Sequence, residues 1–165
     1  MTTIYLDASI FGAWLDQQRG RRVDSPQLRA DRAVLPGLLL GTDGEVAPSF
    51  VTSAEAAVEI ERLASRRPDV AEALRELAGR VRQVPPAPAA QTASCAAVLR
   101  GLTGRSAPSK LVAVQSDARH LAAALASGCQ AFLTVDYHTL WNHRAALQTQ
   151  LGLRLLRPTE QLAAA

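Results

Sequence analysis

Short β-type runs alternate with helical segments along the chain, and this alternation constrains the fold more than any other feature. The clearest β-type runs are mostly apolar and lie at residues 3–6, 46–52, 131–135 and 153–156. Between them, apolar residues recur at helical spacing. Alternation of strands and helices favours a sheet of mostly parallel strands joined by right-handed crossovers. We therefore expect an α/β fold with a mostly parallel central sheet.

Capping and breaking residues set the bounds of the expected helices. Ser9 and Ser53 suit helix N-caps, and Gly128 suits a C-terminal stop. These signals predict helices at residues 10–15, 26–40, 54–66, 69–80, 93–102, 117–127 and 137–149, with a turn at 41–45. Nearby prolines restrict a further short strand at 81–87 to a sheet edge. Residues 159–165 are interpreted as a fraying tail.

Length and composition favour one folded domain. A chain of 165 residues with 48% hydrophobic and 20% charged residues is long enough to bury a core. We expect a single domain over residues 1–165, with its core at about residues 4–156. The formal charge of +3 is a mild basic bias, compatible with phosphate backbones but not specific for them. Lys110 is the only lysine, and the forked guanidinium of the many arginines suits phosphate contacts where they gather on one face.

The cysteines and the N-terminal region argue against several classes of protein. Cys95 and Cys129 stand far apart without a CxxC pair, so neither a zinc site nor a disulfide framework is indicated. Both are expected to be buried small apolar residues. No N-terminal stretch joins a basic region to a continuous apolar run. We therefore expect a cytoplasmic protein without a membrane segment.

Three aspartates occupy positions that can meet at one edge of the expected sheet. Asp7 and Asp136 each follow a β-type run, and Asp117 is expected to open a helix. Residues just past the carboxyl ends of parallel strands line the crevice where ligands bind in such folds. Each aspartate alone has a simpler role, because aspartate is favoured at helix N-termini. Their shared edge is what indicates a site.

A glutamate of the helix expected at residues 54–66 is the candidate fourth acid. Glu59 lies three residues after Ala56 and four before Leu63, which places it at the border of the apolar stripe. Glu55 shares its face one turn earlier and remains an alternative second acid. An ion pair with a nearby arginine is the simpler role for either glutamate.

Four motifs carry these acids in a fixed order along the chain. They are Ile4-Tyr5-Leu6-Asp7-Ala8-Ser9, Val51-Thr52-Ser53 with Glu59, Asp117-Ala118-Arg119-His120-Leu121-Ala122, and Leu133-Thr134-Val135-Asp136. In order and spacing they resemble the PIN-domain family, which includes the VapC-type ribonuclease toxins. The resemblance extends from Ile4 to about Leu156, and its third and fourth motifs are fairly specific as a pair.

The resemblance implies a fold, a reaction and a partner. The fold is a three-layer α/β/α sandwich, and the reaction is hydrolysis of RNA phosphodiester bonds with Mg²⁺ or Mn²⁺. Carried over motif by motif, Asp7, Glu59, Asp117 and Asp136 would be the catalytic metal ligands. The resemblance also implies the toxin of a toxin–antitoxin pair, held silent by a protein antitoxin that covers the acidic cleft. A homodimer is compatible with it.

The expected chemistry of such a site also follows from its carboxylates. Carboxylates packed together repel one another, which raises their pKa values unless a cation is present. Oxygen ligands without thiols select hard ions such as Mg²⁺ or Mn²⁺, and one or two ions fit this donor set. Ser9 and Thr134 are candidates to orient a carboxylate or to hold metal-bound water. Helix capping and turn formation are the simpler roles for these two hydroxyls.

Other functions compete with a metal-dependent nuclease. The three histidines lack a compact zinc motif, so His120 is interpreted as a hydrogen-bonded structural residue. A catalytically inactive PIN-like module that binds RNA or protein, with its acids serving as caps and ion pairs, is the alternative function. A phosphatase with an aspartyl nucleophile is disfavoured, because Ala8-Ser9 places no second aspartate two residues after Asp7.

Overall fold

A parallel sheet forms the centre of the protein in a computed structural model that describes residues 2–40, 49–104 and 108–164. Its five described strands are hydrogen-bonded in the order β3-β2-β1-β4-β5, and every neighbouring pair is parallel. The strands are β1 (Ile4–Leu6), β2 (Phe50–Ser53), β3 (Arg82–Val84), β4 (Ala131–Leu133) and β5 (Arg154–Leu156). The α/β class and the parallel sheet expected from the sequence are confirmed.

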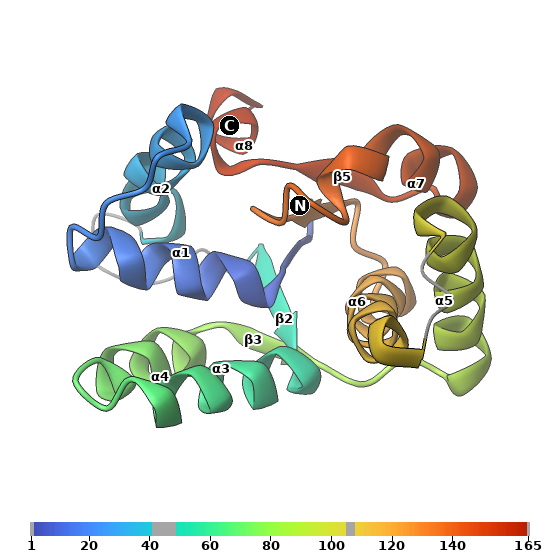
Figure 1. The fold of residues 1–165 in the computed structure, drawn as a ribbon, viewed down its shortest axis with the longest axis horizontal. Helices are drawn as coiled ribbons and strands as arrows, with labels where there is room; N and C mark the ends of the chain where they lie inside the picture. The colour runs from blue at the N-terminus through green and yellow to red at the C-terminus, as the bar shows by residue number, and fades with distance from the viewer. Residues whose placement is uncertain (1, 41–48, 105–107, 165) are drawn as a thin grey trace.

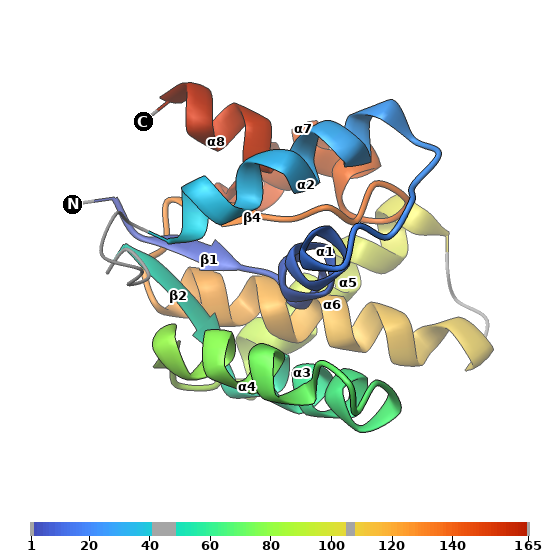
Figure 2. The same cartoon turned by 90° about the vertical axis from the view of Figure 1, so that its left-hand side faces the viewer.

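Helices cover both faces of this sheet and complete a three-layer α/β/α sandwich (Figure 1). One face is covered by α1 (Ala8–Gln18), α2 (Pro26–Leu39), α3 (Ala54–Arg66) and α4 (Ala71–Arg80). The other is covered by α5 (Ala89–Thr103), α6 (Pro108–Ala126) and α7 (Arg144–Leu151). Figure 2 shows α8 (Pro158–Ala164) beside α2, with α6 on the far side of α1. The sandwich implied by the motif resemblance is therefore observed.

The alternation of side chains along β1 divides the core between the two faces. Ile4 and Leu6 point into the apolar cluster under α1 to α4, whereas Tyr5 points into the cluster under α5 to α7. Tyr5 is fully buried and stacks on Phe132 of β4, with ring centroids 5.0 Å apart. Because β1 is buried on both faces, its end is a fixed point from which Asp7 projects.

The starts of two helices differ from the sequence-based prediction. Asp7, rather than Ser9, occupies the N-cap position of α1, and Ser9 lies within its first turn. The helix expected to open at Asp117 instead begins at Pro108, which places Asp117 inside α6. Residues 109–126 contain neither glycine nor proline, so nothing breaks the helix before Asp117.

The C-terminal third also departs from the prediction. The helix expected at 137–149 is replaced by a turn, the short 3₁₀ helix η1 (Trp141–His143) and α7. The turn forms because Asp136 Oδ1 accepts the backbone N–H groups of His138 and Thr139, both at 3.0 Å. The expected fraying tail is wrong for residues 159–164, which belong to α8 (Pro158–Ala164). The Thr159 N–H and hydroxyl of α8 donate to Asp31 of α2 at 3.0 and 2.7 Å.

Several smaller predictions hold. Ser53 caps α3 by accepting the Ala56 N–H at 3.3 Å, and Gly128 ends α6 with φ of +68°. β3 is an edge strand, as its neighbouring prolines require. Cys95 and Cys129 are free and buried. The expected turn at 41–45 and the first part of the strand expected at 46–52 lie outside the described residues.

None of the helices in the described ranges is both long and apolar enough to cross a bilayer.

Candidate functional site

A cavity of about 370 Å³ gathers all four predicted acids at the carboxyl end of the sheet. Asp7 follows β1, Asp136 follows the β4 segment, Glu59 comes from α3 and Asp117 from α6. Glu55, the alternative second acid, is not among the residues that line this cavity. It faces Arg119 instead, with an Oε2 to Nη1 distance of 3.5 Å. The geometry therefore favours Glu59 as the second acid.

Two hydroxyls hold the carboxylate of Asp7. Ser9 Oγ donates to Asp7 Oδ2 at 2.5 Å, and Thr134 Oγ1 donates to the same oxygen at 2.9 Å. Each hydroxyl also accepts a backbone N–H, Ser9 from Val135 at 3.2 Å and Thr134 from Asp136 at 3.0 Å. Because a hydroxyl has one proton to donate, these acceptor bonds direct both protons toward Asp7.

Because of these hydrogen bonds, the Asp7 side chain does not cap α1, although Asp7 stands at the N-cap position of that helix. Both hydroxyl protons go to Oδ2, and Oδ1 accepts no hydrogen bond from the described part of the chain. Asp7 is only 6% exposed, so Oδ1 is an anionic oxygen in a mostly buried setting that is open on the cavity side. Such an oxygen is suited to a cation.

Glu59 is held by side chains of α6. Its Oε1 accepts hydrogen bonds from the Ser116 hydroxyl and from His120 Nε2, the latter at 3.1 Å. The His120 hydrogen bond, reinforced by that of Ser116, holds the pKa of Glu59 below its usual range although burial acts in the opposite direction. Glu59 is therefore ionised and directed toward α6.

His120 links this glutamate to the core. Its Nδ1 lies 2.8 Å from the Tyr5 hydroxyl, which lies 2.6 Å from Ser53 Oγ. Burial alone would lower the pKa of His120, but the hydrogen bond to Glu59 and the charges of Asp7, Glu59 and Asp117 outweigh it and raise the pKa above its ordinary value. His120 is 1% exposed, in keeping with the structural role expected for it, and its ring also lines the acidic cavity.

Asp117 is the acid most affected by its surroundings. Burial, followed by the charges of Asp7 and Asp136, raises its pKa to about 7. In the described ranges no side chain or backbone group donates a hydrogen bond to its carboxylate, and no basic residue forms an ion pair with it. Because Asp117 lies in the middle of α6, it cannot cap that helix. A half-buried carboxylate without these partners is best satisfied by a proton or a cation.

Asp136 is bound differently from the other acids. The hydrogen bonds from His138 and Thr139 to its Oδ1 match the turn-forming role that was its simpler alternative. Its carboxylate nevertheless lines the cavity and contributes to the raised pKa of Asp117. A capping oxygen and a ligand oxygen are compatible in one carboxylate, since it has two oxygens.

The donor set fits a hard divalent ion in its chemistry. Three aspartates and a glutamate offer oxygen ligands only, and the raised pKa of Asp117 marks a site where negative charge is in excess. Among residues 2–40, 49–104 and 108–164, however, no three His, Cys, Asp or Glu side chains are already grouped closely enough to hold a metal ion. An ion would have to draw these carboxylates inward.

Comparisons with known proteins do not identify a family for this chain. The sequence matches no protein-family model and no curated protein. The resemblance to PIN domains therefore stays a prediction that rests on the motifs.

Sequence reasoning missed the contacts that hold Glu59. Helical spacing places Asp117 and His120 on neighbouring positions of one face, which is a usable signal for His120. Ser116 and Tyr5 carried no such signal, because their roles depend on the packing of α3 and β1 against α6.

Proposed function

We propose that this protein is a metal-dependent endoribonuclease that hydrolyses RNA phosphodiester bonds with Mg²⁺ or Mn²⁺. Asp117 carries the proposal. Its carboxylate has no hydrogen-bond donor in the described part of the chain, shares a cavity with Asp7 and Asp136, and has a pKa raised to about 7. Clusters of this kind are common at functional sites, where carboxylates are brought together against their repulsion.

Each acid has a separate part in the proposed site. Asp7, Asp117, Asp136 and Glu59 would hold the ion, which supplies an activated water and charge stabilisation of the leaving oxygen. Ser9 and Thr134 hold Oδ2 of Asp7 and leave Oδ1 without a hydrogen-bond donor among the described residues. His120 and Ser116 keep Glu59 ionised and oriented. These hydrogen bonds restrict the orientations of Asp7 and Glu59 before an ion binds, which lowers the cost of bringing the ligands together.

The substrate and the partner rest on the motif resemblance. It favours RNA over DNA, and it favours a toxin whose antitoxin is a protein that covers the acidic cavity. The cytoplasmic location and a homodimer stay predictions of the same kind.

A catalytically inactive PIN-like module that binds RNA or protein is the second candidate. Three observations favour it: no ready-made metal group exists among the described residues, Asp136 serves a turn, and Glu59 is occupied by His120 and Ser116. Titration with Mn²⁺ separates the two functions, because an inactive module gains no stability from the ion whereas a metal site does.

The decisive experiment is cleavage of single-stranded RNA with Mn²⁺ or Mg²⁺. Purified protein is expected to cut, while Asp7→Asn and Asp117→Asn are expected to lose at least about a hundredfold in rate, comparable with loss of one charge-stabilising group. Asp24→Asn is the matched control, because Asp24 is exposed and outside the cavity. Circular dichroism checks that each variant is folded. Undiminished cleavage by both site variants would refute the proposal.

A further inference from the structure

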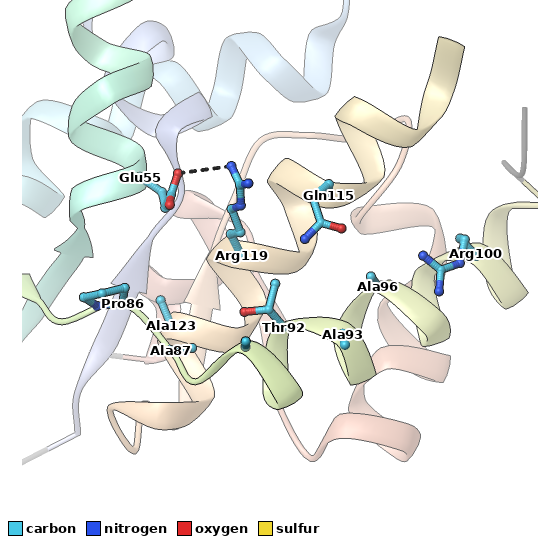
Figure 3. Close-up of a pocket in the computed structure, with 11 residues that line it drawn as sticks. Glu55, Pro86, Ala87, Thr92, Ala93, Ala96, Arg100, Gln115, Arg119 and Ala123 are labelled. Atoms are coloured by element: carbon cyan, nitrogen blue, oxygen red, sulfur yellow. Dashed lines mark ion pairs between the residues drawn. The ribbon is translucent and has the colours of Figure 1, made fainter. Parts of the chain in front are cut away.

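A second cavity, of about 390 Å³, lies between α5 and α6 and reaches α3 (Figure 3). Its floor is made of small side chains, among them Ala93 and Ala96 of α5 and Ala123 of α6. Arg119 and Gln115 project from α6 and Arg100 from α5 around this floor. The cavity therefore combines a floor of small apolar side chains with two guanidinium groups.

These polar side chains extend the cavity into a longer groove. Arg100, Gln115 and Arg119 also line an adjoining cavity of about 380 Å³ that includes Leu111 and Val112. We call the two cavities together the α5–α6 groove.

The arginines of the groove are available to a ligand. Arg100 is exposed, and its guanidinium has no ion pair or hydrogen bond within the described ranges. Arg119 faces Glu55 at 3.5 Å, and both side chains are well exposed, at 49% and 39%. An exposed pair at this distance is weak, so Arg119 can exchange Glu55 for another anion at small cost.

The groove and the acidic cavity share two helices. Glu55 lies one turn before Glu59 on α3, and Arg119 follows Asp117 by two residues on α6. Glu55 and Glu59 lie on one face of α3, about 5.4 Å apart along the helix, whereas Asp117 and Arg119 point to different sides of α6. A polymer chain seated in the groove at Glu55 is thus about one helical turn of α3 from the acidic cavity at Glu59.

We propose that the α5–α6 groove binds the backbone of a single-stranded RNA segment that flanks the cleaved bond, with Arg119 and Arg100 on its phosphates. This inference rests on the proposed function for its substrate. The guanidinium fork donates two parallel hydrogen bonds to a phosphate. The alanine floor leaves room for a base, and Gln115 and Thr92 offer groups that hydrogen-bond to a base edge or a 2′-hydroxyl.

The composition of the groove favours RNA over an acidic protein segment. The alanine floor has room for a base or for an apolar side chain, but the guanidinium groups of Arg100 and Arg119 favour a ligand with regularly spaced anions, as an RNA backbone has. The described lining residues include no aromatic ring, so stacking contributes little and phosphate contacts dominate. Binding is therefore expected to depend strongly on salt.

The test is a binding titration that does not require cleavage. A fluorescent single-stranded RNA is titrated with the full chain in EDTA, at a series of NaCl concentrations, and followed by anisotropy. Arg100→Gln/Arg119→Gln is expected to bind about tenfold more weakly. Its plot of log K against log salt should be shallower by about 1.4, since each phosphate contact on a single strand contributes about 0.7.

Two further variants make the test specific. Arg66→Gln/Arg154→Gln removes the same net charge from exposed positions outside the α5–α6 groove and the acidic cavity. This variant is expected to keep the wild-type salt slope. Glu55→Gln is expected to bind RNA about threefold more tightly, because it frees Arg119 and removes a negative charge from the path. A purely structural ion pair would not produce this gain.

Three results would overturn the inference. They are an unchanged affinity in Arg100→Gln/Arg119→Gln, no RNA binding by the wild-type chain, and displacement of the RNA by poly-glutamate as effectively as by unlabelled RNA. Failure of the nuclease proposal is recognised separately. In that case the wild-type chain binds RNA through the arginines but does not cut it with Mn²⁺ or Mg²⁺.

Discussion

Glu59 Oε1 and His120 Nε2 lie 3.1 Å apart and join α3 to α6 across the acidic cavity. On its other side His120 contacts the Tyr5 hydroxyl of the central strand β1 at 2.8 Å. A half-exposed carboxylate is thereby tied to the most buried part of the sheet through one imidazole ring. His120 therefore helps α3 to position the Glu59 carboxylate.

Substitution of His120 is expected to destabilise the fold. His120→Gln leaves the Tyr5 hydroxyl and Glu59 without one of their partners, so the free energy of unfolding should fall by about 2 kcal/mol, the range for a buried hydrogen bond to a charged group. Urea unfolding measures this change. His138→Gln is the control, because the His138 side chain is exposed. Equal midpoints for His120→Gln and the wild type would contradict the prediction.

The raised pKa of Asp117 predicts how stability depends on pH in the absence of metal. Between its unfolded value near 3.8 and its folded value of about 7, the folded state binds more protons than the unfolded state. Stability should therefore fall as pH rises through this window. At about pH 8, Asp117→Asn should be more stable than the wild type by on the order of 2 kcal/mol. Thermal unfolding in EDTA at about pH 5 and pH 8 tests this.

His120 affects the same measurement with the same sign. Its pKa is raised in the folded state, so its contribution is full at low pH and is lost as pH rises through the folded value. Asp117→Asn should therefore flatten the pH dependence without abolishing it. If the slopes of the variant and the wild type coincide, Asp117 does not hold a proton in the folded state.

Most of the fold could be predicted from the sequence, because the residues that begin, fill and end its helices and strands act locally. Apolar runs, a capping serine at Ser53 and a stopping glycine at Gly128 each act within a few residues of the element that they bound. The sequence-based prediction is wrong where contacts between residues far apart in the sequence determine the local structure. Residues 158–164 lack a strong pattern of their own and form α8 because Thr159 reaches Asp31 on α2.

Only part of the candidate site could be predicted from the sequence. Motif order brought Asp7, Glu59, Asp117 and Asp136 together, and all four line one cavity. Two local interpretations were nevertheless wrong, since Ser9 does not cap α1 and Asp117 does not open α6. The hydrogen bond from Thr134 to Asp7 joins residues 127 positions apart, which no local pattern encodes.

Asp31 is expected to be the residue that fastens α8. It is fully buried and accepts hydrogen bonds from Thr159 and from the Tyr137 hydroxyl. Asp31→Ala should lower the free energy of unfolding by about 3 kcal/mol, because several buried donors lose their acceptor. Hydrogen exchange should also quicken in residues 158–164. Asp24→Ala, at an exposed position of the same region, should change neither, and unaltered exchange in Asp31→Ala would exclude this role.

Thr134 is expected to control metal affinity without contacting the ion. Thr134→Val removes one of the two hydroxyl donors to Asp7 Oδ2 and the acceptor of the Asp136 N–H. Both carboxylates then lose part of their orientation, so Mn²⁺ affinity measured by calorimetry should fall by about tenfold, the lower end for loss of a group that orients a ligand. Thr149→Val alters an exposed threonine whose hydroxyl bonds within α7, and its Mn²⁺ affinity should equal that of the wild type.

Because the fold of Thr134→Val is also weakened, the titration is run at a temperature where circular dichroism shows native structure. Wild-type Mn²⁺ affinity in folded Thr134→Val would mean that Asp7 does not depend on this hydroxyl for its orientation toward an ion.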